Sequence, residues 1–193
     1  MNIYFDTEFT GLHKDTTLIS IGLISEDNET FYAEFIDYDK SQVDDWIKEK
    51  VIDNLIIKYY GVNKDTCNET IIKGNKTLIK FYLSMWLSQF ESVQLVSDVS
   101  HYDMVLFIDI FGSAWDLPKN VNPSCHDINQ DIARYLEVDE KDAFDENRER
   151  LLLYFDEGSE LPIGDKHNSL YDRKSWQVSE MFQSFSCPEK LAH

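Results

Sequence analysis

The sequence predicts an α/β fold in which helices flank one mixed β-sheet. Three strand-like segments follow one another near the start of the chain, and the second half alternates between helical and strand-like patterns without an internal repeat. No linker-like stretch divides the 193 residues, and a chain of this length suits one hydrophobic core. We therefore expect a single domain over residues 1–193.

The three N-terminal segments are expected to be neighbouring strands. Residues 2–6 form a short apolar run. Residues 17–25 (TLISIGLIS) and 29–36 (ETFYAEFI) are rich in β-branched and aromatic residues, which is typical of strands. The polar EDNE between these two segments predicts a hairpin.

Helical patterns become more frequent after the third segment. Residues 76–90 place apolar side chains four residues apart in two rows, which predicts a helix with a broad buried stripe. Residues 93–99 (VQLVSDV) predict another strand, and residues 101–111 predict the helix that follows it. The segment SCHDI near residue 124 predicts a short edge strand.

The acidic composition argues against a protein that binds nucleic acid through a broadly basic surface. The net charge is −18, from 36 acidic and 18 basic residues, whereas phosphate binding normally requires a basic face. Residues 41–80 differ, because seven lysines against six acids give this segment a net charge of +1. The segment can flank a polyanion, but a solvated pair of helices explains it better.

The sequence also lacks signals for export or membrane insertion. No apolar stretch approaches the roughly 20 residues that a membrane-spanning helix needs, and no basic region precedes an apolar core at the N-terminus. Cys67, Cys125 and Cys187 are far apart and lack the close spacings of zinc or redox pairs. We expect reduced thiols, a cytoplasmic location and no membrane partner.

Asp6 and Glu8 stand one residue apart directly after the first apolar run. Side chains two residues apart in a strand point the same way, so both carboxylates can reach one point at the end of the strand. Two such anions favour a hard divalent cation such as Mg²⁺ or Mn²⁺ between them. Two solvated acids at a polar strand end are the alternative, and this pair alone does not decide the matter.

A second acidic segment, SDVSHYDMVLFIDIFG, contains Asp98, Asp103 and Asp109. On a helix that begins near Ser100, Asp103 shares the apolar face, whereas Asp109 lies about 240° around the axis and should be solvated. Asp103 is therefore the acid that we expect to face inward. Ser100 and Asp103 also have the spacing of a capping box, so Asp103 can instead cap the helix.

His167 and Asp172 open the last long helical pattern. A histidine near a helix start and an acid in the first turn are ordinary placements when considered alone. In chain order, however, the three elements give Asp-x-Glu on a first strand, Asp on a middle helix and His-x-x-x-x-Asp on a final helix. The combination is far more specific than any of its parts.

With these three elements the chain resembles the DEDDh group of 3′-to-5′ exonucleases, which have an RNase H-like fold. The family motif Asp-x-Glu-x-Thr-Gly-Leu matches residues 6–12 at every defined position, and His101-Tyr102-Asp103 stands where the family has a helix-borne Asp. In the third motif, His-x-Ala-x-x-Asp, Ser169 replaces the alanine. The short chain, the DTEF opening and the YDMVLF segment look most similar to short bacterial and phage exoribonucleases.

The resemblance implies two-metal hydrolysis of phosphodiester bonds at a 3′ end, with Mg²⁺ or Mn²⁺ and release of nucleoside 5′-monophosphates. By analogy Asp6 bridges both ions, and Glu8 and Asp172 complete the site that activates water. Asp103 serves the second ion, and His167 takes the proton from the water.

The resemblance also implies a substrate-binding wall. The backbone of Thr10 and Gly11 is expected to approach the 3′-terminal nucleotide, and Leu12 is expected to pack against its base. Leu12 can equally belong to the core. The subgroup favours RNA over DNA as the partner, and a homodimer is expected by analogy.

Three other functions remain open from the sequence. One is a 3′-to-5′ exodeoxyribonuclease that acts on single-stranded DNA. A haloacid-dehalogenase-type phosphatase needs Asp-x-Asp, and Glu8 stands at the third position instead. The third is a catalytically silent nucleic-acid-binding module of the same fold, and the presence of all five motif residues argues against it.

Overall fold

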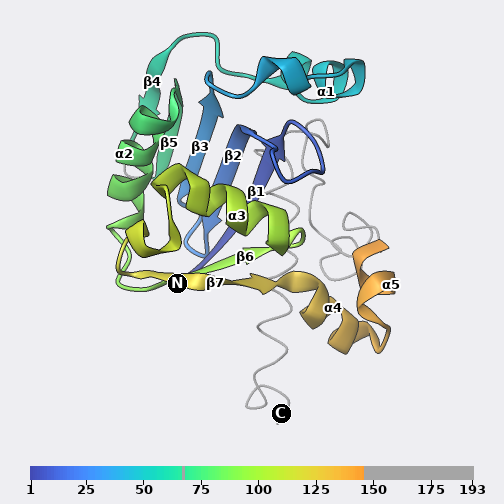
Figure 1. The fold of residues 1–193 in the computed structure, drawn as a ribbon. Coiled ribbons are helices and arrows are strands. Elements are labelled where there is room, and N and C mark those ends of the chain that lie inside the picture. The colour runs from blue at the N-terminus through green and yellow to red at the C-terminus, as the bar shows by residue number, and fades with distance from the viewer. Residues whose placement is uncertain (67, 146–193) are drawn as a thin grey trace, which may run out of the picture.

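The computed structural model describes residues 1–66 and 68–145, in which helices cover a seven-stranded mixed sheet (Figure 1). The strand order is β4-β5-β3-β2-β1-β6-β7, and β2 and β4 run opposite to the other five strands. The strands are β1 (Asn2–Phe9), β2 (Leu18–Ser25), β3 (Thr30–Phe35), β4 (Gly61–Asp65), β5 (Glu69–Gly74), β6 (Val93–Ser97) and β7 (Val121–Asp127). This architecture confirms the predicted α/β class.

The helices pack on both faces of the sheet. They are α1 (Asp45–Lys50), α2 (Lys76–Leu87), α3 (Ser100–Phe111), α4 (Ile128–Leu136) and α5 (Glu140–Asp145), together with the 3₁₀ turns η1 (Lys40–Gln42), η2 (Ile52–Asn54) and η3 (Ala114–Asp116). In Figure 1, α2 and α3 cross in front of the sheet, whereas α4 and α5 lie beyond the end of β7. The front helices enclose the main core with Ile3 and Phe5, and α4 packs against Tyr4 and Val96 on the other face.

Strand β1 lies inside the sheet, where it pairs with antiparallel β2 and with parallel β6. Because side chains alternate along a strand, Phe5 and Thr7 point toward α3, and Asp6 and Glu8 point to the opposite face. The strand extends to Phe9, three residues beyond the predicted end. Both acids are therefore held within a ladder of backbone hydrogen bonds and do not follow the strand.

The prediction of two solvated helices within residues 41–80 is wrong. Among the described residues of this segment, α1 and the start of α2 are α-helical, and β4 and β5 form one edge of the sheet. Strand β5 alternates, with Thr70, Ile72 and Gly74 buried, but β4 is exposed along nearly its whole length. A polar edge strand of this kind lacks the apolar alternation by which a strand is recognised in a sequence.

Within the described residues, the other predicted elements are found with small shifts at their ends. The helix expected over residues 76–90 ends at Leu87, and the strand expected over residues 93–99 ends at Ser97. Residues 124–127 of the SCHDI segment lie in β7, the edge strand on the other side of the sheet, and Ile128 begins α4. Cys125 in this strand is a free thiol, and Cys67 and Cys187 lie outside the described residues. Within residues 1–66 and 68–145, no helix has the length and apolar character to cross a membrane.

Candidate functional site

Asp6 of β1 and Asp98, which follows β6, lie close together at one edge of the sheet. Tyr4 of β1 pairs with Val96 of β6, and Asp6 and Asp98 each stand two residues further along the chain, with carboxylate oxygens within 4.8 Å of each other. Asp98 follows β6 directly, at the edge where the parallel strands have their carboxyl ends. Open α/β sheets commonly bind ligands at this edge.

Asp103 reaches the same place from the first turn of α3. It is 1% exposed, and its carboxylate accepts hydrogen bonds from the Thr7 hydroxyl at 2.5 Å and from the Ser97 hydroxyl. These bonds confirm that Asp103 faces inward, as the helix periodicity predicts. The capping-box alternative is wrong, because α3 has no side-chain cap at its N-terminus and the Ser100 hydroxyl instead donates to Asp127.

Asp6, Asp98 and Asp103 form an acidic cluster that is suited to a cation. Each residue contributes a carboxylate oxygen, and these oxygens lie within 4.8 Å of one another. Sequence reasoning placed Asp6 and Asp103 here but passed over Asp98. The position of Asp98 near the end of a predicted strand was the one indication in the sequence. That position brings Asp98 near Asp6 because β6 pairs with β1. Asp109 is exposed and pairs with Lys76, so it lies outside the cluster.

Burial, and to a smaller extent neighbouring negative charge, disfavours the ionised form of Asp103. Burial raises the pKa of Asp103 to about 7, and the neighbouring Asp98 charge adds to this effect while the hydroxyls of Ser97 and Thr7 oppose it. Burial also raises the pKa of the Cys125 thiol to about 12, with further contributions from Asp103 and Asp127. A bound cation would reverse these effects, because it stabilises the ionised carboxylates.

Glu8 lies on the face of β1 that carries Asp6, but it is not one of the three acids whose oxygens converge. Burial raises its pKa to about 8, and the charge of Asp103 contributes to the shift. Glu8 is therefore close enough to be affected by the acidic cluster. Its assignment as a metal ligand stays a prediction.

The composition of the acidic cluster fits the divalent cations that the sequence predicts. All of its donors are carboxylate oxygens, which favour hard ions such as Mg²⁺ and Mn²⁺ over softer metals. Asp103 is nine-tenths or more buried, and its two hydroxyl partners fix its orientation without neutralising its charge. The described residues therefore offer a partly built site for a cation.

His167 and Asp172 lie outside the described residues, as does the whole of the third sequence motif. Their roles as proton acceptor and metal ligand stay predictions. The part of the site that the structure describes comes from β1, the end of β6 and the start of α3.

The loop after β1 carries the predicted substrate-binding residues. Thr10 is 2% exposed, and its hydroxyl is hydrogen-bonded to Thr17 and Gln42. Gly11 has a φ of 153°, and an added Cβ would approach the His13 ring to 3.0 Å, so glycine suits this position. Leu12 is 75% exposed, which rules out the core placement.

Side chains at the end of β7 and at the start of α4 hold the backbone of Asp98, one of the three acids in the cluster. Asn129 donates from its side chain to the Asp98 carbonyl at 2.8 Å and to the Asp127 carboxylate at 2.8 Å. Asp127 also caps α4 by accepting from the Asn129 backbone at 2.9 Å. The backbone at Asp98 is thus tied to the next strand and helix.

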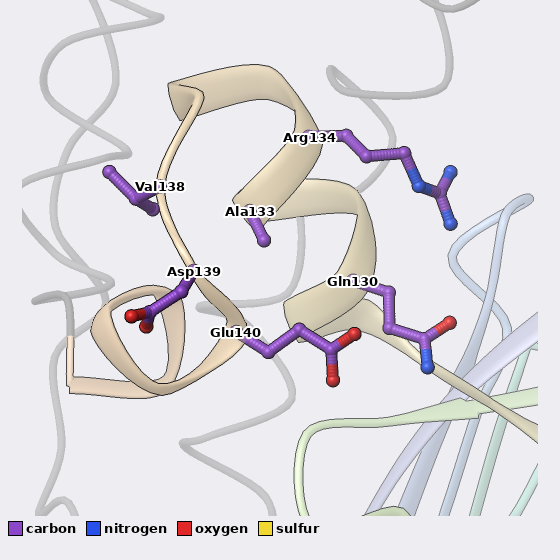
Figure 2. A pocket seen from close by; sticks show the side chains of 6 residues that line it. All are labelled: Gln130, Ala133, Arg134, Val138, Asp139 and Glu140. Atoms are coloured by element: carbon purple, nitrogen blue, oxygen red, sulfur yellow. The ribbon is translucent and has the colours of Figure 1, made fainter.

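A separate cavity of about 620 Å³ lies between α4 and α5 (Figure 2). Its lining residues are Gln130, Ala133, Arg134, Val138, Asp139 and Glu140. None of these residues belongs to the acidic cluster or to the predicted site. We therefore do not assign this cavity to the chemistry of the cluster.

Comparisons with known proteins give relatives of one kind. No family model matches the chain. Two curated relatives, from two strains of Mycobacterium tuberculosis, are both named 3′-5′ exoribonuclease. Each is 22% identical over 130 residues, which span 67% of this chain and 73% of the relative.

Solved structures of exonucleases share the fold. The nuclease domain of 3′hExo, a DEDDh family member solved with bound rAMP, aligns with a TM-score of 0.62 at 14% identity, covering 96% of this chain and 92% of that one. A 3′-exonuclease that recognises the 3′ end of histone mRNA stem-loop aligns with the same TM-score at 13% identity, covering 96% and 82%. The chain has the RNase H-like fold of DEDDh exonuclease domains, which confirms the resemblance found in the sequence.

Proposed function

We propose that this chain is a metal-dependent 3′-to-5′ exonuclease. The observation that carries the proposal is the convergence of Asp6, Asp98 and Asp103 at the carboxyl edge of an RNase H-like sheet. The names of the sequence relatives and the DEDDh structures support the same reaction class. The match of residues 6–12 to the family motif adds support from the sequence.

Two divalent cations, Mg²⁺ or Mn²⁺, are the proposed cofactors. Asp6, Asp98 and Asp103 would hold them, with Glu8 and Asp172 completing the set of carboxylates. When bound, such ions activate water and stabilise the charge that develops on phosphate and on the leaving oxygen.

The chain's own residues orient the reacting groups and move the proton. Thr7 and Ser97 keep the Asp103 carboxylate in one orientation. His167 would accept a proton from the attacking water as its oxygen bonds to phosphorus and the bond to the 3′ oxygen breaks. The products are a nucleoside 5′-monophosphate and a strand with a new 3′-hydroxyl. The exposed Leu12 would pack against the terminal base and the backbone near Thr10 and Gly11 would close the site beyond it.

RNA is the proposed substrate, because the sequence relatives are named exoribonucleases and one structural neighbour recognises an mRNA 3′ end. Single-stranded DNA is the alternative. Digestion of matched 5′-labelled RNA and DNA strands with Mg²⁺ or Mn²⁺ tests the proposal. We expect stepwise shortening of RNA with release of mononucleotides and resistance of a strand blocked by a 3′-phosphate. Release of inorganic phosphate would instead indicate a phosphatase, and binding without cleavage would indicate a silent module.

The proposed role of His167 has its own test. His167→Ala should lower single-turnover hydrolysis by about 10² to 10⁴, the usual contribution of a general base, while the carboxylates still bind divalent ions. Calorimetric titration with Mn²⁺ checks metal binding separately. A near-wild-type rate would remove His167 from the mechanism and leave only the acids.

A further inference from the structure

A transverse row of residues links Glu8 to the far edge of the sheet. Glu8 pairs with Ser20, Ser20 with Glu34, Glu34 with Lys73, and Lys73 with Gly61. The row crosses from β1 through β2, β3 and β5 to β4. At a strand spacing of roughly 4.8 Å, Gly61 lies about 19 Å from Glu8 across the sheet.

Toward the far end of this row, an ion pair between the buried Glu34 and the partly buried Lys73 anchors the segment that precedes β4. Glu34 is 0% exposed and accepts hydrogen bonds from the backbone of Ile56 at 2.7 Å and of Ile57 at 2.8 Å. Lys73 donates to Glu34 at 2.7 Å and to the Ile57 carbonyl at 2.8 Å. Burying charged groups costs free energy unless the groups are fully paired. Because Glu34 is paired with Lys73 and with the backbone of Ile56 and Ile57, these contacts hold the short segment before β4 in one position.

The anchored segment presents two tyrosines to solvent. Tyr59 is 75% exposed and Tyr60 is 62% exposed. The Asn63 side chain donates to the carbonyls of Tyr59 and Gly61, at 2.9 Å each, and so ties the segment at its other end. The two aromatic side chains are therefore exposed on a backbone that is fixed from both sides.

The charge around these tyrosines differs from that of the whole chain. Residues 55–64 (LIIKYYGVNK) contain Lys58 and Lys64 and no acid, although the chain carries a net charge of −18. Lys64 pairs with Glu69, so Lys58 is the main local cation near the tyrosines. Such a surface does not repel phosphate, but it offers little ionic attraction, which leaves stacking as its main source of affinity.

We propose that Tyr59 and Tyr60 form a stacking platform for a single-stranded nucleic acid whose 3′ end occupies the acidic cluster, an inference that rests on the proposed function. Exposed aromatic side chains stack on successive bases with little dependence on sequence. The separation of about 19 Å between Glu8 and Gly61 corresponds to roughly six nucleotides at ~3.4 Å each along a stacked strand. The platform therefore engages strands of about six nucleotides or more and leaves a dinucleotide untouched.

The test measures hydrolysis over a series of strand lengths. Tyr59→Ser/Tyr60→Ser should raise KM about tenfold for strands of roughly ten nucleotides, which lies within the effect of removing one or two stacking contacts. Turnover of a dinucleotide should be unchanged. Tyr59→Phe/Tyr60→Phe should behave as wild type, because the ring is what stacks. Trp115→Ser is the matched control, since this residue is 97% exposed but lies after α3.

Two kinds of result would contradict the stacking platform. A KM that rises equally for the dinucleotide and the long strand, or that changes for neither, overturns the platform while leaving the exonuclease intact. A wild-type protein that sediments as a dimer, with a monomeric double-serine variant, assigns the tyrosines to a second copy and also overturns it.

A binding assay separates this inference from the proposed function. Fluorescence anisotropy with a labelled strand of roughly ten nucleotides in EDTA measures binding without turnover. Binding that depends on the two tyrosines supports the platform even if the wild-type protein hydrolyses nothing. Thermal unfolding confirms that each variant is folded, and an equal loss of binding in the double-phenylalanine variant would contradict stacking.

Discussion

Asp98 and Asp103 belong to one short segment, but different forces position them. Asp98 is placed by the pairing of β1 with β6, and Asp103 by the start of α3 and by hydroxyls from both strands. Both side chains nevertheless reach Asp6.

The two acids can be tested against a third acid from the same segment. Asp98→Asn and Asp103→Asn should each lower metal-dependent hydrolysis by about 10-fold to 100-fold or more, because each removes a charge from the cation site. Asp109→Asn should retain wild-type activity, since Asp109 is exposed and pairs with Lys76. Initial rates across a Mn²⁺ titration check this. Full activity of Asp98→Asn would show that Asp98 is not needed for metal binding and would leave the acids that the sequence alone indicates.

The raised pKa values of Glu8 and Asp103 predict how the metal-free protein responds to pH. Their folded-state pKa values of about 8 and about 7 lie above the ordinary values of 4.5 and 3.8. The folded state therefore binds more protons than the unfolded state between these limits, and the free energy of unfolding falls as pH rises from about 4 to about 8. Urea denaturation in EDTA measures this trend.

A matched variant isolates the contribution of Asp103. Asp103→Asn should flatten the decline in the free energy of unfolding over the lower part of that range, because the amide does not ionise. Adding Mn²⁺ to the wild-type protein should have a similar effect by stabilising the carboxylates. A free energy of unfolding that increases with pH in EDTA would contradict the assigned direction of the shifts.

Sequence periodicity predicts which way a side chain faces only when the helix or strand that carries it can be identified from the sequence. Helical spacing was enough to predict that Asp103 faces inward and Asp109 faces solvent, because both follow from one helix. The position of Asp98 depends on which strands are neighbours and on the register in which they pair. A local sequence pattern contains neither kind of information. Asp6 and Glu8 were predicted to share a face, but the pattern did not reveal that β1 continues past them.

At the scale of elements, the loop after β1 is held by the turn after β3. Gln42, at the end of η1, accepts a hydrogen bond from the Thr10 hydroxyl and donates to the Asp15 carbonyl at 3.0 Å. The backbone of Asp39 donates to the Thr17 hydroxyl at 2.9 Å. Both ends of the loop that carries the exposed Leu12 are therefore fastened to the same turn.

Removing this clamp should affect recognition of the 3′ end more than it affects folding. Gln42→Ala should raise KM and weaken discrimination against a 3′-phosphate, since the wall beyond the terminal nucleotide becomes less fixed. The loss in unfolding free energy should be about 1–3 kcal/mol for two hydrogen bonds. Gln89→Ala, at an exposed glutamine after α2, is the control. Unchanged discrimination against the 3′-phosphate would show that the clamp has no part in substrate binding.

The elements that the sequence predicted have strong apolar periodicity, and the missed ones do not. Strands β2 and β3 are buried along their whole length, and α2 buries one apolar face, so their sequence patterns are clear. Strand β4 has one face in solvent and the other scarcely covered, and its sequence GVNKD gives no alternation. Its place in the sheet depends on pairing with β5, which is a long-range property.

At the scale of the whole molecule, net charge is a poor guide to the partner. A value of −18 alone argues against nucleic acid. The structure brings three acids together at a potential cation site, whereas residues 55–64 have no acid. The spatial distribution of charge therefore matters more than its sum, and composition cannot provide it.

Because β1 lies inside the sheet, we expect it to be among the last parts of the molecule to unfold. Amide protons in a strand that is paired on both sides exchange only when a large part of the sheet separates. Ile3 and Tyr4 pair with both β2 and β6, so they should lie among the slowest-exchanging residues, in contrast to the exposed edge strand β4. Native-state hydrogen exchange measures this directly. On heating, hydrolytic activity should then disappear together with the global fold, and loss of activity well below the unfolding transition would show that another part of the site opens first.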